Sequence, residues 1–200
     1  VENIIPQCTR YRVLNKAEQL KQQGYDVKVV NHSSFIIPDA KHADIVIIYR
    51  ATKSEKLLKL ISIMKKLGRK VYYDIDDLVF DTKYTDQLEY TQSLSKKEKA
   101  SYDAAVQQYG DMLGRCDAVI TSTEHLKTEL EKKKSEVIIH RNVLSKKLIH
   151  LSNKAISKKI TDETIKIAYF SGSITHNENF EMIKPALIKI LEKFKNVELH

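Results

Sequence analysis

The sequence predicts an α/β fold, a Rossmann-like parallel sheet flanked by helices. Short runs of β-branched residues alternate along the chain with longer segments of helical period, the pattern of strands joined by crossover helices. Of the 200 residues, 42% are hydrophobic, which is enough apolar material to fill a core between such layers. The composition therefore excludes a disordered or collagen-like chain.

Short β-branched runs bounded by polar or glycine-containing segments are the candidate strands. We expect strands at residues 26–30, 44–49, 70–75, 118–122, 136–140 and 165–171, with another opening at residues 197–200. In an open parallel sheet, ligands bind beyond the carboxyl ends of the strands. The residues that follow each run are therefore the first candidates for a functional site.

Helical periodicity fills the intervals between these runs. Residues 12–23 and 55–67 each carry an apolar stripe, and each is followed by a glycine, a common helix stop. Residues 95–113 begin with Ser-Lys-Lys-Glu, which predicts a capping box. A last helix is expected after residue 177, where Phe180 opens another apolar stripe.

The positive charge of the chain is concentrated in one stretch. The net charge is +8, and residues 125–160 hold nine Lys and Arg141 against three Glu. Within it, residues 145–160 have the pattern of a basic amphipathic helix that would contact anionic lipid headgroups. The alternative is a solvated lysine face on a helix that packs on the core. We expect no nucleic-acid partner, because the lysines are not interleaved with aromatic residues and no nucleic-acid-binding motif is present.

Cysteine usage and hydropathy predict a cytoplasmic protein. Cys8 and Cys116 form no CxxC motif and no Cys/His cluster, which argues against a disulfide framework or a zinc site. The longest apolar run, residues 45–49, is far shorter than the roughly 20 residues that span a bilayer, and no export signal is visible. Attachment to the inner membrane face would be peripheral, through residues 145–160.

An aspartate-rich segment follows the expected strand at 70–75. Asp74, Asp76, Asp77 and Asp81 lie within eight residues, and three interpretations stay open. In the first, Asp76 or Asp77 caps the following helix or turn. Asp74 and Asp76 would share one side of a strand and hold Mg²⁺, as in metal-dependent phosphatases or DxD-type glycosyl transfer. Alternatively, the carboxylates accept hydrogen bonds from sugar hydroxyls, and one acts as a base.

Two further segments are typical of anion binding. Arg10 and Arg12 head the first helix, where cations are unfavourable unless an anion lies among them; the alternative is that they fold onto surface carboxylates. The segment 171–177 joins a strand to a helix through small residues and predicts a phosphate cradle. Neither a P-loop nor a GxGxxG motif is present.

Five motifs in order resemble bacterial glycosyltransferases of the GT-B fold, family 4 type. They are TRYRVLN at 9–15, YDIDDLVF at 73–80, CDAVITST at 116–123, RNV at 141–143 and IAYFSGSITHN at 167–177. The resemblance covers nearly the whole chain.

The resemblance implies two Rossmann-like domains that face each other across a cleft. Residues 1–160 would be the acceptor-side domain, and residues 161–200 the truncated start of the nucleotide-sugar-binding domain. The implied reaction transfers a sugar from a nucleotide-sugar donor to a glycan or lipid-linked acceptor in surface-polysaccharide or cell-wall biosynthesis. It is typically metal-independent and retaining, and the nucleotide sugar is a co-substrate, so no further cofactor is expected.

The resemblance, together with the positions that follow the expected strands, assigns roles to individual residues. Asp76 and Asp77 would be the catalytic residues. The acceptor side would be lined by Arg10, Arg12, Arg50, Arg141 and Asn142. The donor would be approached by Ser171, Gly172, Ser173, His176 and Asn177.

Two departures from the family pattern bear on activity. The segment 172–180 lacks the Arg and Lys with which many members grip the diphosphate, and the paired-glutamate motif would fall after residue 200. We therefore expect little transferase activity from this fragment alone. The alternatives are a Mg²⁺-dependent phosphatase that uses Asp74 and Asp76, and a non-catalytic basic α/β binding module.

Overall fold

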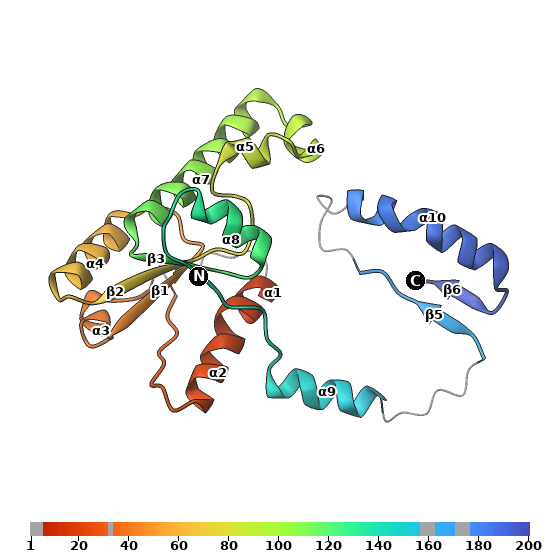
Figure 1. Ribbon diagram of the computed structural model, residues 1–200, viewed down its shortest axis with the longest axis horizontal. Helices are drawn as coiled ribbons and strands as arrows, with labels where there is room; N and C mark the ends of the chain where they lie inside the picture. Colours follow the sequence, from red (N-terminus) through yellow and green to blue (C-terminus); the bar gives the residue numbers. More distant parts are fainter. Residues whose placement is uncertain (1–5, 32–33, 157–162, 171–176) are drawn as a thin grey trace.

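The structure, a computed structural model, confirms the α/β class and describes residues 6–31, 34–156, 163–170 and 177–200. Two parallel sheets are present among these residues, one of four strands and one of two (Figure 1). Of the described helices, none has the length and apolar character needed to cross a bilayer. Cys8 and Cys116 are both free thiols.

The four-stranded sheet places its strands in sequence order. These strands are β1 (Ile45–Tyr49), β2 (Lys70–Asp74), β3 (Ala118–Thr121) and β4 (Val137–Ile139). The parallel register pairs Tyr49 with Asp74, and Asp74 with Ile120. The carboxyl ends of β1, β2 and β3 therefore lie side by side at one edge, as the sequence predicts.

Three helices supply most of the apolar side chains that cover this sheet. They are α4 (Glu55–Lys66), α7 (Lys96–Arg115) and α8 (Glu124–Glu131). Met64 of α4, Met112 of α7 and Leu130 of α8 are fully buried in one core cluster with Val71 of β2. The ends of these helices are set locally: Ser54 caps α4, and Ser95 and Glu98 form the predicted capping box of α7.

The segment after β2 reaches α7 through two short helices, α5 (Thr82–Thr85) and α6 (Glu89–Gln92). Gly110 allows α7 to approach this segment closely, because a Cβ at that position would lie 2.6 Å from the backbone oxygen of Phe80. In Figure 1, α5, α6 and the first turns of α7 lie together at the top of the molecule.

The predicted first helix is present, but it is not uniform. It comprises α1 (Pro6–Thr9), a π-helical stretch η1 (Arg10–Leu14) and α2 (Asn15–Gln22). Gly24 follows it with a φ of 87°, the left-handed conformation that favours glycine. A short π-helical stretch within an α-helix often lies at a functional site.

The prediction of a strand at residues 26–30 is wrong. This segment follows α2 without strand pairing, and Val29 and Val30 are 41% and 40% exposed. β-branched residues stabilise a strand chiefly by packing on neighbouring strands. Val29 and Val30 are exposed and pack on no neighbouring strand, so their β-propensity does not produce a strand here. A short helix, α3 (Ile37–Lys41), precedes β1.

The C-terminal part contains a separate βαβ unit. The strands β5 (Ile165–Ile167) and β6 (Val197–Leu199) are parallel, and α10 (Asn177–Lys193) connects them. The expected strand at 165–171 is thus shorter, and its last residue lies outside the described residues. Neither β5 nor β6 is hydrogen-bonded to the four-stranded sheet.

The basic amphipathic helix is also confirmed. It forms α9 (Lys146–Ile156), and residues 157–160 of the predicted helix lie outside the described residues. None of the residues of α9 is buried. Its lysines are therefore not the outer face of a helix that is packed on the core.

Candidate functional site

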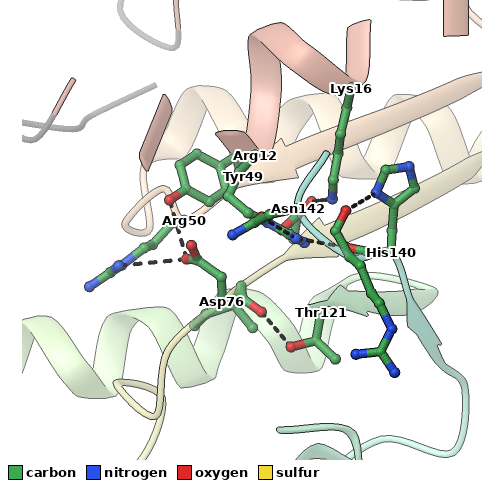
Figure 2. Close-up of polar contacts among 11 residues, drawn as sticks. Arg12, Lys16, Tyr49, Arg50, Asp76, Thr121, His140 and Asn142 are labelled. Atoms are coloured by element: carbon green, nitrogen blue, oxygen red, sulfur yellow. Dashed lines mark hydrogen bonds and ion pairs between the residues drawn. The ribbon is translucent and has the colours of Figure 1, made fainter. Parts of the chain in front are cut away.

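Polar side chains from four segments meet at the carboxyl edge of the four-stranded sheet. They come from the N-terminal helix and from the ends of β1, β2 and β4 (Figure 2). Two clusters can be distinguished. The first surrounds Asp74, the last residue of β2, and the second surrounds Asp76.

Asp74 holds two cations from the N-terminal helix. Arg12 donates to Asp74 Oδ1 from Nε at 3.0 Å and from Nη2 at 2.6 Å. Lys16 Nζ lies 2.7 Å from Asp74 Oδ2. The three residues are at most 7% exposed. Burial is unfavourable for an unpaired charge, so the two cations and the carboxylate stabilise one another in this buried position.

Arg12 also links the helix to the end of β4. Its Nη1 donates to the carbonyl oxygen of His140 at 2.7 Å and to Asn142 Oδ1 at 3.1 Å. One turn of helix away, Asn15 Nδ2 donates to the carbonyl oxygen of Val143 at 2.7 Å. The guanidinium of Arg12, which lies in the π-helical stretch η1, thus joins the N-terminal helix to the end of β2 and to the segment after β4.

The second cluster is built around Asp76. The Tyr49 hydroxyl donates to Asp76 Oδ1 at 3.2 Å, and Arg50 Nη1 lies 3.7 Å from the same oxygen. Arg50 Nη2 lies 3.5 Å from Asp77 Oδ2. The Asp76 side chain is 14% exposed and that of Asp77 is 57% exposed. Asp77 Oδ1 also accepts a hydrogen bond from the Leu78 N–H at 2.9 Å. Both carboxylates therefore contact protein donors, and Asp77 is the more exposed of the two.

The backbone around this cluster is held from both sides. Arg50 has a φ of 41°, a rare conformation for a residue other than glycine, and its N–H donates to the carbonyl oxygen of Asp74. The buried Thr121 hydroxyl donates to the carbonyl oxygen of Ile75 at 2.8 Å (Figure 2). The position of Asp76 is fixed by these neighbouring strands rather than by its own loop.

Burial and charge shift the pKa values of three groups at this edge. Burial lowers the pKa of Lys16, and Asp74 opposes the shift. Burial and the nearby Lys16 lower the pKa of His140, so its imidazole is neutral at pH 7. Burial and Asp76 raise the pKa of Tyr49, so its hydroxyl remains a hydrogen-bond donor.

The structure brings some of the predicted site residues together and separates others. Arg12 contacts Asn142, and Arg50 lies beside Asp76 and Asp77. Arg10 is exposed, and Arg141 pairs instead with Glu124, at the start of α8, at 3.1 Å. Both partners of that pair are more than 60% exposed.

The predicted donor-binding segment lies almost wholly outside the described residues. This is the case for Ser171, Gly172, Ser173 and His176, and Asn177 is described only as the first residue of α10.

Sequence reasoning missed Lys16, Tyr49, Thr121 and His140. A signal was available for Lys16, because it follows Arg12 by four residues and such residues share one face of a helix. Tyr49 immediately precedes Arg50 at the end of an expected strand. Nothing local marks the Thr121 hydroxyl or the His140 carbonyl oxygen as partners of distant groups.

The described residues contain no group of three or more His, Cys, Asp or Glu side chains that could hold a metal ion. Both oxygens of Asp74 are taken by cations of the protein itself.

Comparison with known proteins does not name a family. No family model, no curated protein and no solved structure matches the chain.

Proposed function

We propose that the chain is the acceptor-side portion of a glycosyltransferase, which transfers a sugar from a nucleotide-sugar donor to a glycan or lipid-linked acceptor. The observation that carries the proposal is the cluster of Tyr49, Arg50, Asp76 and Asp77 at the carboxyl edge of a parallel sheet. The resemblance of five ordered motifs to family 4 glycosyltransferases supports the same activity.

The cluster suits the recognition of a hydroxyl-rich acceptor. Ionised carboxylates accept hydrogen bonds, and sugar hydroxyls donate them. Tyr49 and Arg50 hold Asp76, so little side-chain freedom would be lost when an acceptor binds. Asp77, which is more exposed, would contact the acceptor directly or take its proton.

The phosphatase alternative has less support. It requires Asp74 to bind Mg²⁺ or to attack phosphorus, yet Asp74 is 1% exposed and its oxygens bind Arg12 and Lys16. In the glycosyltransferase proposal Asp74 is structural, and it holds the N-terminal helix on the sheet.

A thermal-shift screen with UDP, GDP and dTDP tests the proposal. It would be run with and without EDTA, on this chain and on a form extended past residue 200 through a complete second domain. We expect stabilisation of the extended form alone, unaffected by EDTA, because a ligand stabilises only the form that binds it. Stabilisation that requires a divalent cation, or none in either form, would contradict the proposal.

Substitution of Asp76 tests the site in the extended form. Asp76→Asn should lower sugar transfer at least about tenfold, because it removes a positioned charge from the acceptor side. The matched control is Asp111→Asn, at an exposed position of α7, which should leave transfer unchanged. Equal activity of the two variants would exclude Asp76 from the reaction.

We also propose that α9 contacts an anionic lipid surface, at which a lipid-linked acceptor would be presented. Ile149, Leu151 and Ile156 of α9 are 47%, 49% and 78% exposed, and Lys146, Lys147 and Lys154 lie on the same helix. Exposed apolar residues beside lysines are typical of helices that lie in the membrane interface.

Vesicle co-sedimentation tests this contact. The chain should bind phosphatidylglycerol vesicles and not phosphatidylcholine vesicles, and Lys146→Glu with Lys147→Glu should abolish binding. As a control, Lys65→Glu with Lys66→Glu changes the charge equally at the end of α4 and should leave binding intact. Equal loss in both double variants would show that only net charge matters.

A further inference from the structure

A groove lies between α6 and the first turns of α7, outside the cluster around Asp76. Its volume is about 550 Å³. The two helices lie close together at the top of Figure 1. Aromatic, aliphatic, hydroxyl and charged side chains line the groove: Tyr90, Leu94, Lys97, Glu98, Ser101 and Tyr102.

The walls of the groove are anchored to the rest of the molecule. On the α6 side, the buried Thr91 hydroxyl interacts with the carbonyl oxygens of Thr85 and Leu88, at 2.6 and 2.8 Å. On the α7 side, Lys99 Nζ lies 2.5 Å from Asp86 Oδ1 and 2.6 Å from Asp103 Oδ1. Thr85 and Asp86 lie at the end of α5, so α6 and α7 are each tied to that helix, and the groove exists before any ligand binds.

The lining has the two properties that a sugar ring requires. A pyranose has apolar C–H faces, which pack on aromatic rings, and an edge of hydroxyls, which both donate and accept hydrogen bonds. Tyr90 and Tyr102 supply rings with centroids 6.4 Å apart at 70°, and Tyr90 is 39% exposed. Lys97 supplies a donor on the rim, and Glu98 and Ser101, which also take part in hydrogen bonds within the first turns of α7, supply acceptors.

Tyr102 is the aromatic residue that α7 contributes to the groove. Burial raises its pKa, so its hydroxyl remains a hydrogen-bond donor. Its ring packs edge-on against that of Tyr90 on α6. The two rings therefore form one aromatic wall to which both helices contribute.

We infer that the groove between α6 and α7 is a saccharide-binding subsite that would hold the glycan part of the acceptor. That the saccharide belongs to an acceptor rests on the proposed function, whereas saccharide binding itself is a property of this chain alone. Tyr102 is the principal contact, because its ring lines the groove and packs against Tyr90.

Saturation-transfer NMR on the 200-residue chain tests the inference without any nucleotide sugar. The probes are tetrasaccharides of glucose, of galactose and of N-acetylglucosamine. We expect transfer to at least one of them, a roughly tenfold weaker Kd for Tyr102→Ala, and near-parent binding for Tyr102→Phe, which keeps the ring. Tyr25→Ala is the matched control, since Tyr25 is 64% exposed on a different segment.

Loss of the ring must be separated from loss of the fold. Circular dichroism and thermal unfolding of Tyr102→Ala should match the parent, and Tyr90→Ala provides a second variant in the same groove. The inference is overturned if no tetrasaccharide gives transfer. It is equally overturned if Tyr102→Ala and Tyr90→Ala both bind like Tyr25→Ala.

Failure of this inference differs from failure of the proposed function. If the extended form transfers sugar and Tyr102→Ala leaves the acceptor KM unchanged, the subsite is wrong and the glycosyltransferase proposal stands. If a tetrasaccharide binds and Tyr102→Ala abolishes binding, yet no nucleotide sugar stabilises the extended form, the groove stands and the transferase proposal fails.

Discussion

At the scale of single residues, the arrangement around Asp74 contains more positive than negative charge. Arg12 and Lys16 both bind this one carboxylate, and all three side chains are nearly inaccessible to solvent. A buried ion pair costs desolvation free energy, and removal of the shared partner leaves its counter-charges unpaired. The carboxylate is therefore the residue on which the network depends.

Asp74→Asn should lower the free energy of unfolding by about 3–5 kcal/mol, because two buried cations lose their counter-charge. Lys16→Met should cost clearly less, since Arg12 and Asp74 still balance each other. Urea unfolding measures both, with Glu124→Gln, which breaks an exposed pair, as the control expected to change little. Equal losses in Asp74→Asn and Lys16→Met would contradict this account.

His140 should make stability depend on pH. Burial and Lys16 lower its pKa from the ordinary 6.5 in the folded chain, so the unfolded chain binds a proton more readily. Its contribution is present above pH 6.5 and is lost as the pH falls toward the lowered folded value. Urea midpoints at about pH 8 and pH 5 should differ less in His140→Gln than in the parent.

The control for this measurement is His150→Gln on α9, where no residue is buried. It should retain the pH dependence of the parent. If His140→Gln and His150→Gln behave alike, the pH dependence arises elsewhere.

At the scale of elements, α7 is positioned by a glycine rather than by its apolar stripe alone. Gly110 brings the helix against the backbone at Phe80, directly after the segment that carries Asp76 and Asp77. The same helix carries Tyr102, which lines the proposed subsite. The close approach at Gly110 therefore helps to fix the position of that helix.

Gly110→Ala should destabilise the chain by about 1–3 kcal/mol, because the new Cβ would lie 2.6 Å from a backbone oxygen that cannot easily move. Gly114→Ala is a matched control in the same helix, with nothing within 4 Å of its Cβ position. It should stabilise the chain by about 0.5–1 kcal/mol through helix propensity. Thermal unfolding of both variants checks the opposite signs; a gain in both would contradict the close approach.

At the scale of the whole molecule, the two sheets differ in how well they are buried. All residues of β3 are buried, whereas β5 and β6 have none that are. A two-stranded sheet is marginally stable by itself. The βαβ unit at 165–199 should therefore open more readily than the four-stranded sheet.

Native-state hydrogen exchange measures this difference. Amides of β2 and β3 should exchange only through global unfolding, while those of β5 and β6 should exchange at least about tenfold faster through local opening. The edge strand β1 serves as an internal comparison of intermediate burial. Uniform protection across both sheets would contradict the prediction.

Much of the fold was predictable because it depends on local signals. Alternation of β-branched runs and helical periods predicts six strands that the structure contains, within a few residues at their ends. The capping box at Ser95 and the glycine stops depend on neighbouring residues only. The strand predicted at 26–30 is wrong because a strand needs a partner, and the sequence of one segment does not show whether a partner is present.

The site was predictable only in part. The sequence by itself determined that Arg50, Asp76, Asp77 and Asn142 would lie near the carboxyl ends of strands, because order along the chain and parallel pairing place them there. Only the tertiary structure decided which of them touch. In the folded chain, Asp74 pairs with Arg12 and Lys16. Asp76 contacts Tyr49 and Arg50, and Arg141 pairs with Glu124. The physical reason is that buried charges must find partners, and those partners lie up to 130 residues away, where no local pattern records them.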